Sequence, residues 1–71
     1  MEELRLHDLV ALTVALPEHN LRRVEIGVIV DIGSGNRYLV EFVGKNGVPY
    51  AMPTIHMDGL MKVYLQADLA E

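Results

Sequence analysis

The chain has no cysteine and no tryptophan, and only six of its 71 residues are lysine or arginine. Without cysteine it forms no disulfide, no thiolate zinc site and no cysteine nucleophile, so we expect a reducing compartment, the cytoplasm. Without tryptophan it lacks a ring that polyproline-recognising grooves commonly use. Ten acidic residues give a formal net charge of −4. Because this charge repels a phosphate backbone, nucleic acid is not the expected partner.

Long apolar runs are absent as well. The longest stretch without a charged residue, 46–57, contains two prolines and falls well short of the roughly 20 apolar residues of a membrane helix. We therefore expect no membrane span. The length allows a single domain over residues 1–71, with its core at about 6–65. A core this small uses most of its apolar residues for folding and leaves little room for a catalytic cavity.

What the chain does contain is a series of short apolar runs separated by turn residues. The runs predict strands over 8–15, 25–32, 37–43, 48–52 and 60–65. Polar, Gly-containing or Pro-led segments at 17–20, 33–36, 44–47 and 56–59 predict the turns between them. This order is typical of an all-β fold, a small five-stranded SH3-like barrel, with frayed ends that include the tail 66–71.

Alternation within the runs predicts which side chains face inward. In the run 25–32, Ile26, Val28, Val30 and Ile32 share one face, and Glu25, Gly27, Ile29 and Asp31 share the other. We place the first of these faces in the core. The full predicted core is Leu9, Ala11, Ile26, Val28, Val30, Tyr38, Val40, Phe42, Tyr50, Leu60 and Val63.

Five segments between residue 6 and about residue 60 carry a characteristic order: 6–12 (LHDLVAL), 16–21 (LPEHNL), 24–30 (VEIGVIV), 38–42 (YLVEF) and 50–55 (YAMPTI). Together they resemble a small, chiefly bacterial family of domains of unknown function, number 4926. Val24 departs from the family pattern, which often has glycine there, and Pro53 interrupts its usual apolar run. Genes of this family look like companions of nuclease-like toxin genes, so the resemblance implies an antitoxin or immunity protein.

No residue pattern points to catalysis or to a bound metal or cofactor. The spacing of His7, His19 and His56 matches no compact zinc pattern. The glycine-rich segment 33–36 lacks the lysine of a phosphate-binding loop and precedes a strand, so it predicts a hairpin turn. We therefore expect a non-enzymatic domain with no catalytic residues, no metal site and no cofactor.

Acidic side chains are the best candidates for contact with a partner. Glu25, Asp31 and Glu41 are expected on the outward face of the second and third strands, and Glu18 and Asp58 in loops. Such side chains either solvate the domain or bind a protein partner, for example by masking the basic groove of a nuclease toxin. Two alternatives stay open: an RNA- or translation-associated module that uses Arg22 and Arg23, and a structural homodimer paired through an open barrel edge.

Overall fold

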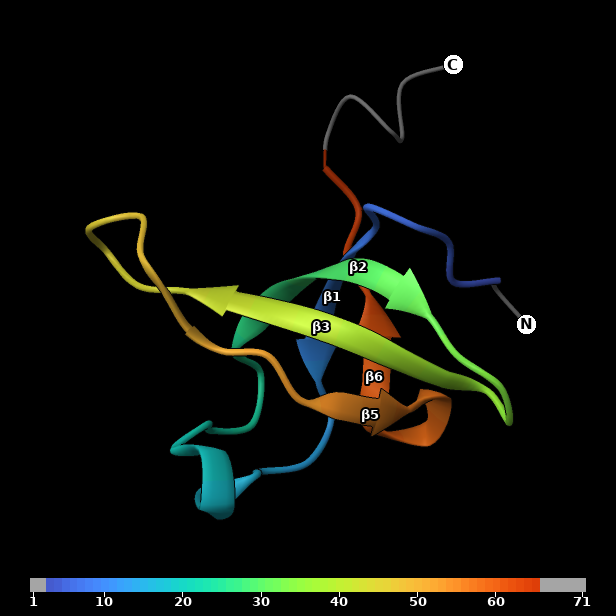
Figure 1. Ribbon diagram of the computed structural model, residues 1–71, viewed down its shortest axis with the longest axis horizontal. Coiled ribbons are helices and arrows are strands. Elements are labelled where there is room, and N and C mark those ends of the chain that lie inside the picture. The colour runs from blue at the N-terminus through green and yellow to red at the C-terminus, as the bar shows by residue number, and fades with distance from the viewer. Residues whose placement is uncertain (1–2, 66–71) are drawn as a thin grey trace.

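A computed structural model describes residues 3–65 and is all-β, as predicted. No α-helix occurs in this range, and no helix there is long and apolar enough to cross a membrane. Figure 1 shows the strands, with β3 lying across the front and β1 and β6 behind it. The strands are β1 (Leu9–Leu12), β2 (Ile26–Ile32), β3 (Arg37–Val43), β4 (Pro49–Ala51), β5 (Thr54–His56) and β6 (Leu60–Lys62); η1 (Pro17–His19) and η2 (Met57–Gly59) are short 3₁₀ turns.

The strands form one antiparallel sheet in the order β4-β3-β2-β1-β6, with β5 also paired to β3. The sheet has six strands rather than the five predicted. The predicted fourth strand does not end at Pro53 but continues beyond it, as the two segments β4 and β5. Phe42 pairs with Ala51 in β4 and Leu39 with Thr54 in β5. Between these pairs the amide of Val40 donates to the Pro53 carbonyl at 3.0 Å. Proline has no N–H to donate, so it divides one long strand into two.

Other predicted boundaries are shorter in the structure. The first strand covers Leu9–Leu12 rather than 8–15, and the last covers Leu60–Lys62 rather than 60–65. The predicted single domain with frayed ends extends to residues 1–2 and 66–71, which lie outside the described residues. In the order of pairing, β4 and β6 are the two ends of the sheet, which is therefore open.

The hydrophobic core lies on the inner face of the curled sheet. Its buried members are Leu4, Val10, Leu12, Leu21, Ile29, Val40, Phe42, Ile55 and Leu60. The predicted assignment of faces on β2 is wrong, since Ile29 is fully buried whereas Ile26 is 55% exposed. Tyr50 is also wrongly placed in the predicted core, because it is 48% exposed. Val40, Phe42 and Leu60 are buried as predicted.

Gly27 explains why the faces of β2 are reversed. A Cβ atom at this position would lie 2.7 Å from Val40 Cγ1 and 2.9 Å from a ring carbon of Phe42. The missing side chain lets β3 fold closely over β2, and this close approach turns Gly27 and Ile29 into the interior. Alternation alone could not show that the face with the smallest residue is the inner one.

A register shift between Ile29 and Asp31 then changes which side of the sheet the end of β2 faces. Ile29 pairs with Val40, but the next aligned pair is Asp31 with Leu39, so Val30 is the extra residue of a bulge. Leu39 is adjacent to the inward-facing Val40, and successive side chains of a strand alternate. Asp31 therefore shares the outer side with Leu39.

The predicted hairpin turns are confirmed. Gly33 N donates to the Arg37 carbonyl at 2.8 Å, and Gly35 and Asn36 both have positive φ, as a tight β2–β3 turn requires. Gly44 N donates to the Val48 carbonyl at 3.0 Å across the next turn, where Gly47 has a φ of 80°. These turns set the register of β3 against its neighbours on both sides.

Candidate functional site

The outer face of β6, β1 and β2 is apolar, and two of its side chains, Ile26 and Met61, are exposed. Two rows of side chains cross these strands, as the register shows. In the first row Ala11 lies between Met61 and Ile26. In the second, Leu9 lies opposite Val28, and its carbonyl accepts a hydrogen bond from Val63 N. We call this surface the outer apolar face: Leu9, Ala11, Ile26, Val28, Met61 and Val63.

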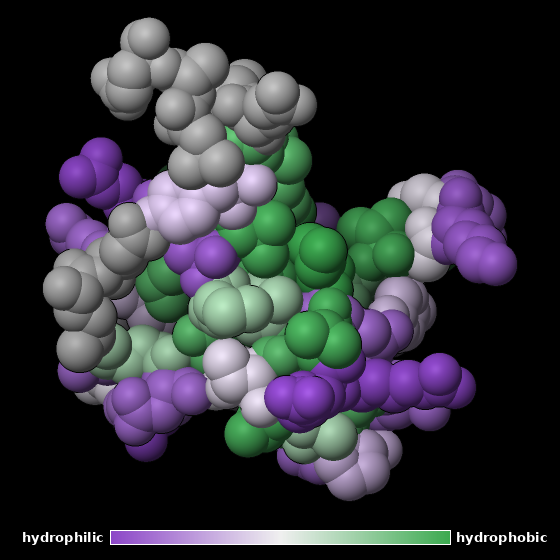
Figure 2. Space-filling model, turned by 180° about the vertical axis from the view of Figure 1, so that it is seen from behind, coloured by the Kyte–Doolittle hydropathy of each residue, from purple (hydrophilic) through white to green (hydrophobic). Residues whose placement is uncertain are grey.

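The exposed fraction of the side chains differs along the first row. Ala11 is almost fully buried, whereas Ile26 and Met61 are 55% and 50% exposed. The small alanine thus lies almost fully buried between two half-exposed apolar side chains. Figure 2 views the molecule from this side and shows hydrophobic residues gathered across the middle, with hydrophilic residues around them. Exposed apolar side chains that gather on one face are candidates for contact with another molecule.

A hollow of about 400 Å³ lies at one end of the outer apolar face, between Leu9 and Val63 and the side chains around them. The Lys62 ammonium lies in its wall, 3.5 Å from Asp8 Oδ2 and 5.3 Å from the centre of the Tyr64 ring. Asp8 Oδ2 also accepts a hydrogen bond from the Arg5 backbone at 2.8 Å. The charged groups of this wall are therefore already paired within the chain.

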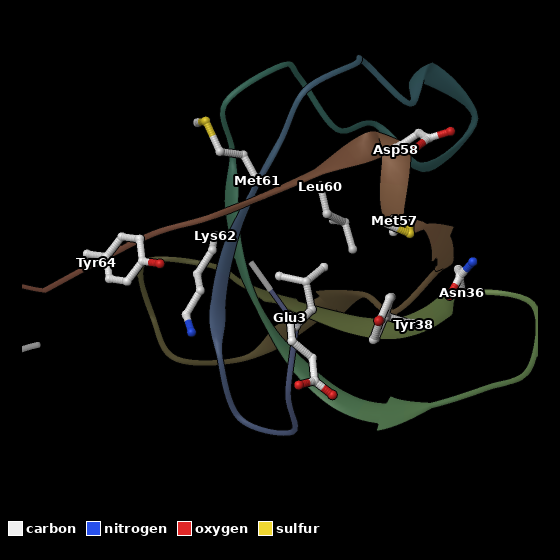
Figure 3. Close-up of a pocket in the computed structure, with 10 residues that line it drawn as sticks. Glu3, Asn36, Tyr38, Met57, Asp58, Leu60, Met61, Lys62 and Tyr64 are labelled. Carbon is white, nitrogen blue, oxygen red and sulfur yellow. The ribbon is translucent and has the colours of Figure 1, made fainter. Parts of the chain in front are cut away.

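A second hollow, a groove of about 750 Å³, lies on the other side of β6, between that strand, η2 and β3. In Figure 3 the Leu60 and Tyr38 side chains point into the groove, whereas Asp58 and Asn36 lie at its rim. Leu4 and Leu60, which line it, belong to the hydrophobic core. The groove is thus mainly the open end of the core, and its polar groups do not converge on one point.

The five acidic residues predicted to contact a partner do not form one continuous surface. Glu41 lies opposite Val28, at the end of the second apolar row, and Asp31 follows on the same side of the sheet. Glu18 lies in η1 and Asp58 in η2, away from these strands. Glu25 precedes β2. The structure therefore brings two of the five, Asp31 and Glu41, to the border of the outer apolar face.

Glu25 is held in place by two hydrogen bonds. Its Oε2 accepts from the Arg22 backbone at 2.7 Å, and its Oε1 accepts from the Tyr50 hydroxyl at 3.0 Å. Loss of hydration and the neighbouring Glu25 carboxylate raise the pKa of Tyr50 above its ordinary value. This contact ties β4 to the beginning of β2. It was not predicted, because residues 25 residues apart in sequence gave no signal of it.

The histidines do not assemble a catalytic or metal site. His56 Nδ1 accepts a hydrogen bond from the Asp58 backbone at 3.1 Å and lies 3.5 Å from Asp58 Oδ2, so it caps η2. Both side chains are substantially exposed, and no third group orients them for proton transfer. Within residues 3–65 no three histidine or acidic side chains are close enough to hold a metal ion. His56 and Asp58 therefore stabilise the local turn η2.

The basic residues are distributed over several elements. Arg22 and Arg23 precede β2, Arg37 begins β3, and Lys45 lies in the turn after it. Among the aromatic side chains Phe42 is buried and Tyr38 packs against the core, so Tyr50 and Tyr64 are the exposed rings, and Tyr50 is the one held next to the Arg22–Glu25 turn. Binding of single-stranded nucleic acid usually combines a basic groove with exposed stacking rings. The described surface offers less support for the RNA alternative than for a protein contact.

Comparison with protein families matches residues 6–62 to the family described as "Domain of unknown function (DUF4926)". The match covers most of the chain. The chain belongs to this family. The resemblance of the five segments is thereby confirmed, and the DUF4926 match spans every described strand from β1 to β6. Neither the curated proteins nor the solved structures gave a match.

The outer apolar face was missed as a site, although its signal is present in the sequence. Residues 9–12 (LVAL) are apolar at every position rather than at alternate ones. A strand with both faces apolar is typical of a sheet that is covered on both sides. In this DUF4926 domain the inner side forms the core, whereas Ile26 and Met61 on the outer side are exposed.

Proposed function

We propose that this DUF4926 domain is a non-enzymatic protein-binding module whose partner docks on the outer apolar face. The observation that carries the proposal is the exposure of Ile26 and Met61 on either side of the buried Ala11, in the middle of an apolar surface. Two exposed apolar side chains of this kind suit an apolar contact with a partner, and desolvation of such a contact is the main source of affinity in protein interfaces.

Charge at the border of the face indicates what surrounds that contact on the partner. Asp31 and Glu41 lie on the outer side of β2 and β3, beside the apolar rows. Carboxylates at the border of an interface favour a partner with lysine or arginine opposite them, and opposite charges accelerate association. The negative net charge of the whole chain acts in the same direction.

The family resemblance supports a specific form of this proposal, in which the partner is a nuclease-like toxin and the domain is its cytoplasmic antitoxin or immunity protein in a bacterium. A nuclease binds its substrate in a basic groove. An apolar contact bordered by carboxylates would mask that groove without any chemical step. The proposed masking residues are Ile26 and Met61 for contact, with Asp31 and Glu41 for charge.

Co-expression tests the proposal. The full chain is expressed with the product of the adjacent gene, and the complex is isolated through a tag on that product. Wild type is expected to co-purify, whereas Ile26→Asp is expected to be lost, because an unpaired carboxylate is then buried in the contact. Val48→Asp is the matched control, since Val48 is 57% exposed but lies in the β3–β4 turn, outside the face.

Two results would contradict the proposal. One is failure of the wild type to co-purify with a product that is harmless to cells by itself. The other is a homodimer: if light scattering shows that the isolated chain is dimeric and that Ile26→Asp makes it monomeric, the face binds a second copy instead.

A further inference from the structure

Val24 occupies a backbone conformation that valine rarely adopts. The residues from Arg22 to Glu25 form a turn in which Glu25 N donates to the Arg22 carbonyl at 3.2 Å. Val24 is the third residue of this turn and has a φ of 65°, in the left-handed region. Positive φ at this position favours glycine, and a β-branched side chain there is strained. The turn is nevertheless held firmly, because Val24 N donates to the Leu12 carbonyl at 2.8 Å.

The strain is not compensated by packing within the chain. Val24 is 60% exposed, the highest value among the large hydrophobic residues that the structure describes. Its neighbour Glu25 is fixed by the Arg22 amide and the Tyr50 hydroxyl. The turn therefore presents an apolar side chain to solvent in a fixed position, two residues before Ile26 of the outer apolar face.

The two arginines of the turn form no ion pair with the residues that the structure describes. Arg22 and Arg23 are both exposed, and within residues 3–65 no ion pair joins either guanidinium to an acidic side chain. Asp31, which borders the same strand, lies near its opposite end. Along β2 the outer apolar face thus has the two arginines before the strand begins, Glu41 opposite Val28, and Asp31 near the end of the strand.

We infer that Val24 is a contact residue of the proposed interface, and that the partner surface opposite this turn is apolar with acidic residues facing Arg22 and Arg23. The inference rests on the proposed function and adds to it an orientation of the partner. Its basic side lies over Asp31 and Glu41, and its acidic side lies over the turn. Residues held in strained backbone conformations cluster at functional sites.

The test measures stability and affinity in parallel, with the co-expressed product of the adjacent gene as the probe. Val24→Gly is expected to raise the melting temperature of the free domain and to weaken binding by about fivefold or more, the effect of losing one significant contact. Val24→Thr keeps the shape and the strain but adds a hydroxyl. It is expected to weaken binding to a similar degree while leaving the melting temperature close to that of the wild type.

Val48→Thr is the matched control and is expected to change neither quantity, since Val48 is similarly exposed but lies outside the face. Arg22→Glu together with Arg23→Glu is expected to weaken binding, more strongly at low salt than at high salt. Wild-type affinity in Val24→Thr, or a lower melting temperature in Val24→Gly, overturns the inference but leaves the proposed function standing if Ile26→Asp still abolishes the complex. Absence of any wild-type complex overturns both.

Discussion

The two faces of β2 are similar in sequence and opposite in role. Ile29 on the inner face is fully buried, whereas Ile26, three residues earlier on the outer face, is 55% exposed. Both are isoleucines in the same strand, so neither residue type nor strand propensity separates them. The difference lies in what the rest of the chain covers. Apolar residues on the inner face stabilise the fold, and those on the outer face remain available for a partner.

This comparison also separates two uses of a small apolar residue. Gly27 on the inner face permits close approach of Val40 and Phe42. Ala11 on the outer face lies between Met61 and Ile26 and is almost fully buried, whereas these two neighbours are half exposed. A small residue in a strand can therefore be buried on either face of the sheet.

The largest expected difference is between the two isoleucines. Ile29→Ala should reduce the free energy of unfolding by about 2–5 kcal/mol, because it leaves a cavity in the core. Ile26→Ala should reduce it by less than about 1 kcal/mol, because the side chain is half in solvent already. Urea denaturation of both variants measures the difference. Equal losses would show that the outer face is covered in the free protein.

Gly27→Ala should reduce the free energy of unfolding by about 1–3 kcal/mol, since the new methyl group would overlap Val40 and Phe42. Gly33→Ala is its matched control, because a Cβ at Gly33 would meet only the Arg37 carbonyl, at 3.5 Å. Thermal denaturation compares the two variants. A stable Gly27→Ala variant would contradict the close approach that determines which face of β2 is inside.

A smaller effect is expected at the border between the two faces. There the Asp8 carboxylate accepts a hydrogen bond from the Arg5 amide and forms an ion pair with the Lys62 ammonium. Asp8→Ala should reduce the free energy of unfolding by about 1 kcal/mol, mainly through loss of the hydrogen bond that fixes the turn. Lys62→Met should change it little, because its methylene stem is kept and a partly exposed ion pair contributes little. If Lys62→Met lowers the free energy of unfolding more than Asp8→Ala does, the ion pair contributes more to stability than the hydrogen bond.

The smallest expected effect concerns Tyr50 and pH. Its pKa is raised in the folded protein, so its contribution to stability is fully present below the pKa of the unfolded chain. That contribution is lost as pH rises through the folded pKa. Glu25→Gln should lower the pKa of Tyr50 toward its ordinary value, which an NMR titration of the Tyr50 ring measures. An unchanged pKa in this variant would show that Glu25 does not hold the hydroxyl.

Local signals in the sequence were sufficient for most of the strand and turn pattern. Alternating runs placed β2 and β3, and Gly and Asn with positive φ close the turns that follow them. Pro53 was correctly seen as an interruption, but not as one within a continuing strand. Continuation depends on the Pro53 carbonyl accepting a hydrogen bond from Val40, a contact between residues distant in sequence.

The candidate site was predicted only in part. Asp31 and Glu41 do border the outer apolar face, but Glu18 and Asp58 lie on separate 3₁₀ turns. The apolar residues of the face itself were assigned to the core instead, as with Ile26 and Val28. Ile26 is 55% exposed and Val28 half-buried because the core of the described residues lies on the other side of the sheet, and hydrophobicity alone does not show which side that is.

The sequence by itself determined the all-β class, the positions of the turns, the lack of cysteine chemistry and membership of the family, because each depends on residue type and local spacing. Only the tertiary structure decided which face of β2 is inside and that Glu25 meets Tyr50. A two-residue period always produces two faces. When both are apolar, the choice between them is made by the curvature that Gly27 permits and by what the chain has left to cover them.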